Sequence, residues 1–157
     1  MQPEERFMIM AIEKAKEGIE KGNSPFGACI VKDGEAISCE HNIVWQSTDI
    51  TAHAEINAIR KACEKLDTID LSGCVIYSTC EPCPMCFAAC HWARILTIVY
   101  GAGIADAKEA GFSELSIPNE KMKKLGPSPV EVISGFLLAK NIELFKMWSQ
   151  KPGKRVY

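Results

Sequence analysis

The sequence has neither a strong excess of one charge nor a long apolar run. Its 157 residues include 18 Lys and Arg against 20 Asp and Glu, which gives a formal net charge of −2. This balance provides no global field that would draw the chain to nucleic acid or to an anionic membrane. No apolar stretch approaches the about 20 residues that a membrane-spanning helix needs. We therefore expect neither a membrane nor a nucleic acid as a partner.

A secretory leader is not expected from the first residues of the sequence. The first segment, MQPEERFMIMAIEK, carries acidic residues and has no uninterrupted apolar core, so it does not resemble a signal peptide. The expected location is the cytoplasm. Internal repeats, low-complexity segments and linkers are absent too, and a chain of this length suits one well-buried domain. The prediction is a single domain over residues 1–157.

Cysteine, by contrast, is abundant, with eight residues. An even count is typical of disulfide frameworks in small secreted proteins that lack a full core. This chain has 47% hydrophobic residues and no export signal, so free thiols and metal ligands are the better interpretation. Four cysteines lie in apolar stretches and are expected to be small core residues: Cys29, Cys39, Cys63 and Cys74.

Hydrophobic periodicity predicts the order of helices and strands. Helices are expected at 5–21, 52–66 and 136–150, and strands at 26–31, 35–41, 74–79, 95–101 and 130–135. The first two strands form a hairpin around the turn KDG. Residues 80–94 begin as a turn and continue as a short helix, and residues 102–128 are expected to be loop with one short helix. A hairpin followed by alternating helices and strands indicates an α/β fold with a mixed five-stranded sheet flanked by helices.

Two short clusters carry side chains that helix formation does not require. His53 and Glu55 stand at the apparent start of one helix, and Cys83 and Cys86 at the start of another. Residues three apart in a first helical turn face the same side, and a helix N-terminus favours thiolates. Two thiolates and one neutral imidazole make three zinc ligands, and a catalytic zinc keeps its fourth position for water. The two clusters therefore predict one zinc site.

Two alternatives remain open from the residues alone. A purely structural zinc needs a fourth protein ligand, and Cys80 and Cys90 are near enough in sequence to supply one. Glu55 could serve only as a first-turn acid that stabilises the helix dipole. Positions i and i+2 of a regular helix point about 200° apart, so His53 and Glu55 can share a site only where the helix begins.

Together the two motifs resemble the zinc-dependent cytidine and deoxycytidylate deaminase superfamily. His53-Ala54-Glu55 and the later run PCPMC at 82–86 match its zinc signature. The resemblance implies a cytidine deaminase-like three-layer sandwich with one Zn²⁺ per subunit, held by His53, Cys83 and Cys86. It also implies that Glu55 is the catalytic residue that carries protons between the attacking water and the base.

Longer stretches narrow the resemblance to the small bacterial-type guanine deaminases. These stretches are SPFGACIVKDG, TAHAEINAIRKAC, STCEPCPMC and DAKEAGF. The implied reaction is hydrolytic deamination of a free purine base, guanine to xanthine plus ammonia, by an aminohydrolase that acts on a cyclic amidine. The implied substrate contacts are Phe26, Asn42, the Ala54 backbone N–H, Trp92, Glu114 and Tyr157. Ser113-Glu114 stands where the family carries an acidic pair.

The tail, residues 151–157, has two interpretations. Composition favours a frayed end. The guanine deaminases that the chain resembles are homodimers in which this segment crosses to the partner and an aromatic residue covers the bound base. The resemblance therefore implies that Tyr157 helps to close a pocket in trans, because a lid that excludes water strengthens polar contacts to a small ligand.

Other functions remain as alternatives to guanine deamination. One is a wobble-adenosine deaminase acting on tRNA, which would need phosphate contacts. A second is a deaminase of another base or nucleoside, such as cytosine or guanosine. A non-catalytic zinc module is the third.

Overall fold

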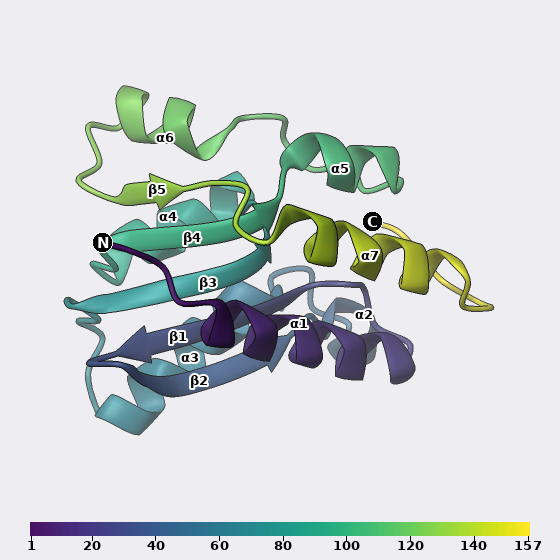
Figure 1. The fold of residues 1–157 in the computed structure, drawn as a ribbon, viewed down its shortest axis with the longest axis horizontal. Helices are drawn as coiled ribbons and strands as arrows, with labels where there is room; N and C mark the ends of the chain where they lie inside the picture. Colours follow the sequence, from purple (N-terminus) through teal and green to yellow (C-terminus); the bar gives the residue numbers. More distant parts are fainter.

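The computed structural model describes residues 1–157 and has three layers, with helices on both faces of one sheet (Figure 1). The sheet has the strand order β2-β1-β3-β4-β5. β1 pairs antiparallel with both β2 and β3, whereas β3, β4 and β5 run parallel. The strands are β1 (Gly27–Lys32), β2 (Glu35–His41), β3 (Cys74–Cys80), β4 (Thr97–Ala102) and β5 (Glu131–Ile133). The predicted α/β fold with a mixed five-stranded sheet is confirmed.

The helices divide between the two faces of the sheet. α1 and α7 pack together on one face, and α3 and α4 lie on the other (Figure 1). The helices are α1 (Glu5–Glu20), α2 (Val44–Ser47), α3 (Ala54–Leu66), α4 (Pro84–Trp92), α5 (Ile104–Glu109), α6 (Asn119–Leu125) and α7 (Leu138–Ser149). In α1 the apolar positions at helical spacing are buried, including Met8, Ile12 and Ile19, so burial of this face against the sheet stabilises the helix.

The topology brings several chain segments to one edge of the sheet. β3 and β4 are parallel and therefore end at the same edge. β1 runs against β3, so Phe26, just before β1, lies at that edge as well. β2 runs against β1, which places Asn42, just after β2, beside it. Because ligands of α/β sheets bind outside the carboxyl ends of the parallel strands, this edge is where a site is expected.

Some local expectations need correction. The connection after β2 contains the short helix α2, and residues 102–128 hold two short helices, α5 and α6, where one was expected. Cys29 and Cys39 are direct partners in the β1–β2 register, and a disulfide joins them. The expectation of free thiols is therefore wrong for this pair, because it considered burial and not strand register. None of the helices combines the length and the apolar character needed to cross a bilayer.

Candidate active site

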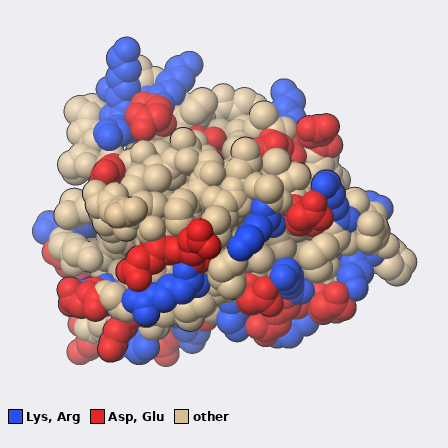
Figure 2. Space-filling view, in the orientation of Figure 1, with Lys and Arg blue, Asp and Glu red and all other residues tan.

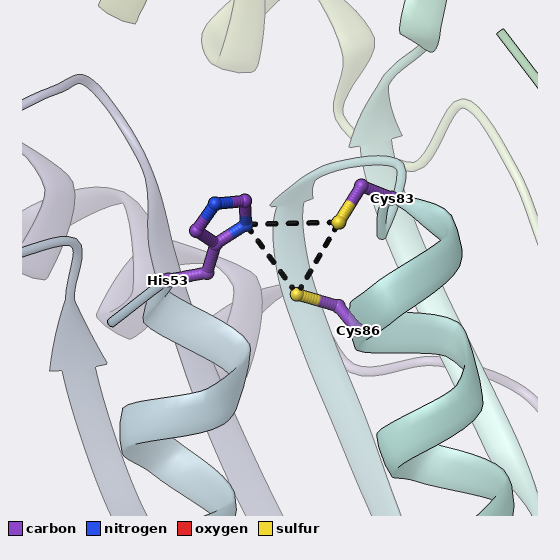
Figure 3. Close-up of side chains that lie close together, drawn as sticks. All are labelled: His53, Cys83 and Cys86. Atoms are coloured by element: carbon purple, nitrogen blue, oxygen red, sulfur yellow. Dashed lines mark hydrogen bonds between the residues drawn. The ribbon is translucent and has the colours of Figure 1, made fainter. Parts of the chain in front are cut away.

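The three expected zinc ligands converge from the starts of two helices. His53 is the N-cap residue of α3, and Cys83 is the N-cap residue of α4, with Pro84 at the first helical position. Proline suits this position because its missing N–H has no intrahelical partner to lose. Cys86 follows one turn later, and the two sulfur atoms point at the imidazole ring (Figure 3).

The spacing of the three ligand atoms fits zinc. The Nδ1 atom of His53 lies 3.7 Å from the Sγ atom of Cys83 and 3.5 Å from that of Cys86, and the two sulfur atoms are 3.7 Å apart. Zinc bonds of ordinary length in a tetrahedron give edges of about 3.8 Å between two sulfur atoms and about 3.6 Å between sulfur and nitrogen. His53, Cys83 and Cys86 therefore form a zinc site with the dimensions of three tetrahedral corners.

No fourth protein ligand completes this site. His53, Cys83 and Cys86 form its whole metal-binding group. The thiol of Cys80 points to the carbonyl oxygen of Gly103, at 3.7 Å, and Cys90 is buried in the core between the sheet and α4. The alternative of a closed structural zinc thus loses both of its candidates. An open fourth position is what a catalytic zinc requires.

The electrostatics of the paired thiols suit a cation. Hydrogen bonding from Cys86 lowers the pKa of Cys83 to about 4 against the opposing effect of burial. The same hydrogen bond and burial hold the pKa of Cys86 well above its usual range. One thiolate is therefore available at neutral pH, and a bound metal ion deprotonates the second thiol.

Glu55 is the second residue of α3 and lies beside the zinc ligands. It is 6% exposed, and the hydroxyl group of Ser78 on β3 donates to its Oε1 atom at 3.1 Å. Burial raises the pKa of Glu55 above its ordinary value. Ser78 was not predicted, and its strand also carries the hydroxyl groups of Tyr77 and Thr79, so the sequence did not single it out.

A pocket of about 300 Å³ opens above these residues, at the lower end of the range for small-molecule sites. Five residues of the predicted site besides the zinc ligands line it: Phe26, Asn42, Glu55, Glu114 and Tyr157. Lining residues that the sequence did not predict are Ile50, Glu81, Met85, Phe112 and Leu115. Phe112 directly precedes Ser113-Glu114 in the AGF motif, so that motif could have identified it.

Asn42 and Tyr157 meet across the pocket, although 115 positions separate them. The amide nitrogen of Asn42 donates to the Tyr157 hydroxyl group at 2.6 Å, and its Oδ1 atom accepts from the Val44 backbone N–H at 3.0 Å. The Tyr157 ring lies 5.6 Å from the His53 ring and 5.4 Å from that of Phe112. These contacts are made within one chain, so the structure has the tail closing its own pocket.

Glu114 faces the pocket from the loop between α5 and α6. Burial, with repulsion from the charge of Cys83, raises the pKa of Glu114 to about 8. The neighbouring Ser113 N–H donates to the Tyr157 backbone oxygen at 3.1 Å, so the Glu114 loop and the tail support each other.

The two remaining predicted substrate contacts, Trp92 and Ala54, are not among the residues that line the pocket. Trp92, at the end of α4, is 84% exposed and does not line the pocket. The prediction that it forms a wall is wrong for this chain, because α4 carries its last turn away from the pocket. Ala54 is fully buried as the first residue of α3, where its N–H has no intrahelical partner.

The fold and this site define a zinc-dependent deaminase. The chain belongs to the cytidine and deoxycytidylate deaminase zinc-binding family, whose model matches residues 1–102.

Among known proteins, the chain is 42% identical to the guanine deaminase of Bacillus subtilis (strain 168) over 156 residues, 98% of each chain. It is 47% identical to the tRNA-specific adenosine deaminase of Aquifex aeolicus (strain VF5) over 107 residues, 68% of this chain and 70% of the relative. A solved structure in complex with 8-azaguanine is 30% identical, with a TM-score of 0.85 over 92% of this chain and 82% of the other. Homologous proteins thus bind purine bases.

Proposed function

We propose that this protein hydrolyses guanine to xanthine and ammonia. The observation that carries the proposal is the cover that two chain segments form over part of the pocket. Tyr157 and the Glu114 loop lie above the zinc ligands and leave about 300 Å³, a space suited to a free base. A polynucleotide must leave the pocket on both sides of the base, and the tail obstructs that path. The similarity to a guanine deaminase along nearly the whole chain supports the same substrate.

The zinc ligands, Glu55 and Ser78 have different roles in the proposed reaction. Zn²⁺ held by His53, Cys83 and Cys86 supplies a Lewis acid and lowers the pKa of water towards neutrality. Glu55 takes a proton from the attacking water and delivers it to the ring nitrogen beside the amino-bearing carbon. It then helps to protonate the departing amine, so that water and guanine become xanthine and ammonia. The hydrogen bond from Ser78 keeps the Glu55 carboxyl group oriented for both transfers.

We assign the binding of the base to the other pocket residues. The Glu114 carboxyl group can accept hydrogen bonds from the ring N–H and the exocyclic amine. The Oδ1 atom of Asn42 accepts from Val44, and one amide hydrogen is donated to Tyr157, so the second amide hydrogen is the group that Asn42 offers to an acceptor on the base. The free N–H of Ala54 offers a second donor. Phe26 and Tyr157 supply apolar and aromatic surface against the ring.

The tail serves as a lid over this pocket. Its contacts include the stacking of Arg155 on the Trp45 ring, 4.2 Å from the ring centroid. A lid that excludes water strengthens the few polar contacts that a free base can make. In the structure the lid belongs to the same chain; a lid exchanged between subunits is the alternative.

A homodimer is also proposed, as the family resemblance implies. The supporting observation is the Trp92 side chain at the end of α4, which is 84% exposed. Large aromatic side chains are enriched in protein interfaces. Light scattering is expected to give twice the chain mass for the wild type and a single chain mass for Trp92→Gln at low concentration. A wild-type monomer contradicts the dimer.

The substrate is tested by measuring ammonia and base products with the zinc-loaded protein. Guanine, adenine, cytosine, guanosine and cytidine are offered separately. We expect xanthine and ammonia in equal amounts from guanine, and turnover at least about 100-fold slower for the others, because a site built to hydrogen-bond one base leaves polar groups unpaired with another. Faster release from cytosine or guanosine would replace guanine as the substrate.

A further inference from the structure

Glu81 lies in the loop between β3 and the zinc ligand Cys83, and it is only 7% exposed. It is not a zinc ligand, and the proposed reaction does not use it. Its Oε2 atom accepts a hydrogen bond from the Ile104 backbone N–H at 3.3 Å, and its Oε1 atom from the Asn119 N–H at 2.8 Å. Ile104 begins α5 and Asn119 begins α6. One buried side chain therefore holds the starts of two helices.

A third hydrogen bond runs in the opposite direction. Asn119 is fully buried, and its amide nitrogen donates to the Pro82 carbonyl oxygen at 2.6 Å. Three hydrogen bonds thus join residues 81–82 to both ends of the segment 104–119. A buried polar group that loses its partner bears the full cost of its desolvation, so these three bonds strongly resist separation of the two segments.

The segment 104–119, which lies between these hydrogen bonds, carries pocket residues. It includes Phe112 and Glu114, and residues 113–118 lie outside any helix or strand. Burial and neighbouring charges set the pKa of Glu114, and no hydrogen bond to the protein contributes. The location of its carboxyl group therefore depends on where the backbone of the segment is held.

We propose that Glu81, together with Asn119, is a positioning residue that fixes the Glu114 carboxyl group relative to the zinc site. Glu81 and Pro82 directly precede Cys83, so the same loop carries a zinc ligand and holds the Glu114 segment. This arrangement sets the distance between the reacting carbon and the group that orients the base. The inference rests on the proposed function, which names guanine as that base.

The first test is the variant Glu81→Gln. Glutamine keeps one acceptor but turns an NH₂ group towards the second backbone N–H, so one of the two ties is lost. We expect zinc to remain bound and kcat/KM for guanine to fall about 10-fold, mainly through KM, because a small misplacement of a substrate contact is costly. Glu109→Gln is the matched control, since Glu109 is an exposed acid in the same segment. It should leave both constants unchanged.

A double-mutant cycle with Glu114→Gln separates positioning from general loss of structure. If Glu81 acts through Glu114, adding Glu81→Gln to Glu114→Gln lowers kcat/KM by less than about 2-fold, because coupled residues are not additive. A full multiplication of the two separate effects would overturn the proposal.

A measurement without substrate keeps this test independent of the reaction. Amide hydrogen exchange should be at least about 10-fold faster in Glu81→Gln at whichever of Ile104 and Asn119 loses its acceptor, while α3 and α4 keep wild-type protection, since local opening is reported region by region. Unchanged exchange at both amides overturns the proposal. A wild-type protein that releases no ammonia from guanine overturns the proposed function instead, and the exchange result still decides whether Glu81 holds the segment.

Discussion

The floor of the pocket and its cover are built in different ways. The floor consists of His53, Glu55, Cys83 and Cys86, all within the first turns of α3 and α4. The cover consists of the loop 112–115 and the tail 151–157. Its hydrogen bonds join distant parts of the chain, such as Asn42 to Tyr157 and Ser113 to Tyr157.

This difference suggests that the floor and the cover have different roles. The family model ends at residue 102, so it includes the whole floor and none of the cover. The matched region thus holds the ligands, the proton carrier and the proposed contacts Phe26 and Asn42, and we propose that the segments after residue 102 complete the choice of substrate. On the face that Figure 2 shows, Lys and Arg lie among Asp and Glu around an area without charged side chains.

The largest expected effect comes from the floor. Glu55→Ala should keep one zinc per chain and lose at least about 100-fold in kcat, the usual scale for general acid–base catalysis. Zinc is measured by atomic spectroscopy, and turnover by xanthine formation. Glu64→Ala, an exposed acid on the same helix, is the control and should match the wild type. Near-normal turnover of Glu55→Ala would remove this residue from the reaction.

In the cover, Glu114→Gln should lower kcat/KM for guanine by about 10- to 100-fold with zinc retained, because an NH₂ group takes the place of one of the two carboxyl oxygens that face the donors of the base. The exposed Glu120 of the next helix provides the control, Glu120→Gln. Equal kcat/KM values for Glu114→Gln and the wild type would mean that another base is the substrate.

Deleting residues 152–157 should cut kcat/KM for guanine at least about 10-fold while zinc stays bound, as for other lids that complete a site. Full activity of the shortened protein would make the tail a frayed end.

A mixture tells whether the lid acts in cis. The deletion protein is unfolded, refolded together with Glu55→Ala and assayed. A lid that closes its own pocket predicts no recovery, since one chain lacks the lid and the other lacks the proton carrier. Recovery of activity would mean that a tail crosses to the partner.

The smallest effect on activity is expected from the contact between Arg155 in the tail and the Trp45 ring. Arg155→Gln removes the charge stacked on Trp45, and an exposed cation–π contact contributes about 0.5–1 kcal/mol. We expect kcat/KM to fall by about 2- to 5-fold, with Lys154→Gln unchanged as the control. Equal losses in the two variants would indicate a general effect of charge.

Short-range patterns made the floor predictable. His53 and Cys83 are N-cap residues, in agreement with the expectation that both clusters stand at the starts of helices. Such features depend on neighbours within one helical turn, which the sequence displays directly. The alternating pattern of strands and helices gave the sheet for the same reason.

Contacts between distant parts of the chain could not be predicted from the sequence. The Cys29–Cys39 disulfide depends on strand register, and the ties of Glu81 depend on two helix starts far along the chain. Trp92 was misplaced because the direction of the last turn of α4 depends on the packing of that helix. The short helix α2 gave no periodic signal, since it spans only Val44–Ser47.

The central claim is that the cover selects a free base for a floor that the family shares. Its most direct test offers guanine and a tRNA anticodon stem-loop with a wobble adenosine together, at equal concentration, to the zinc-loaded wild type. Chromatography then measures xanthine and inosine. We predict xanthine in at least about 100-fold excess, because on this account the tail lies in the path that a polynucleotide would need on both sides of the base. Inosine formed as fast as xanthine would contradict the claim.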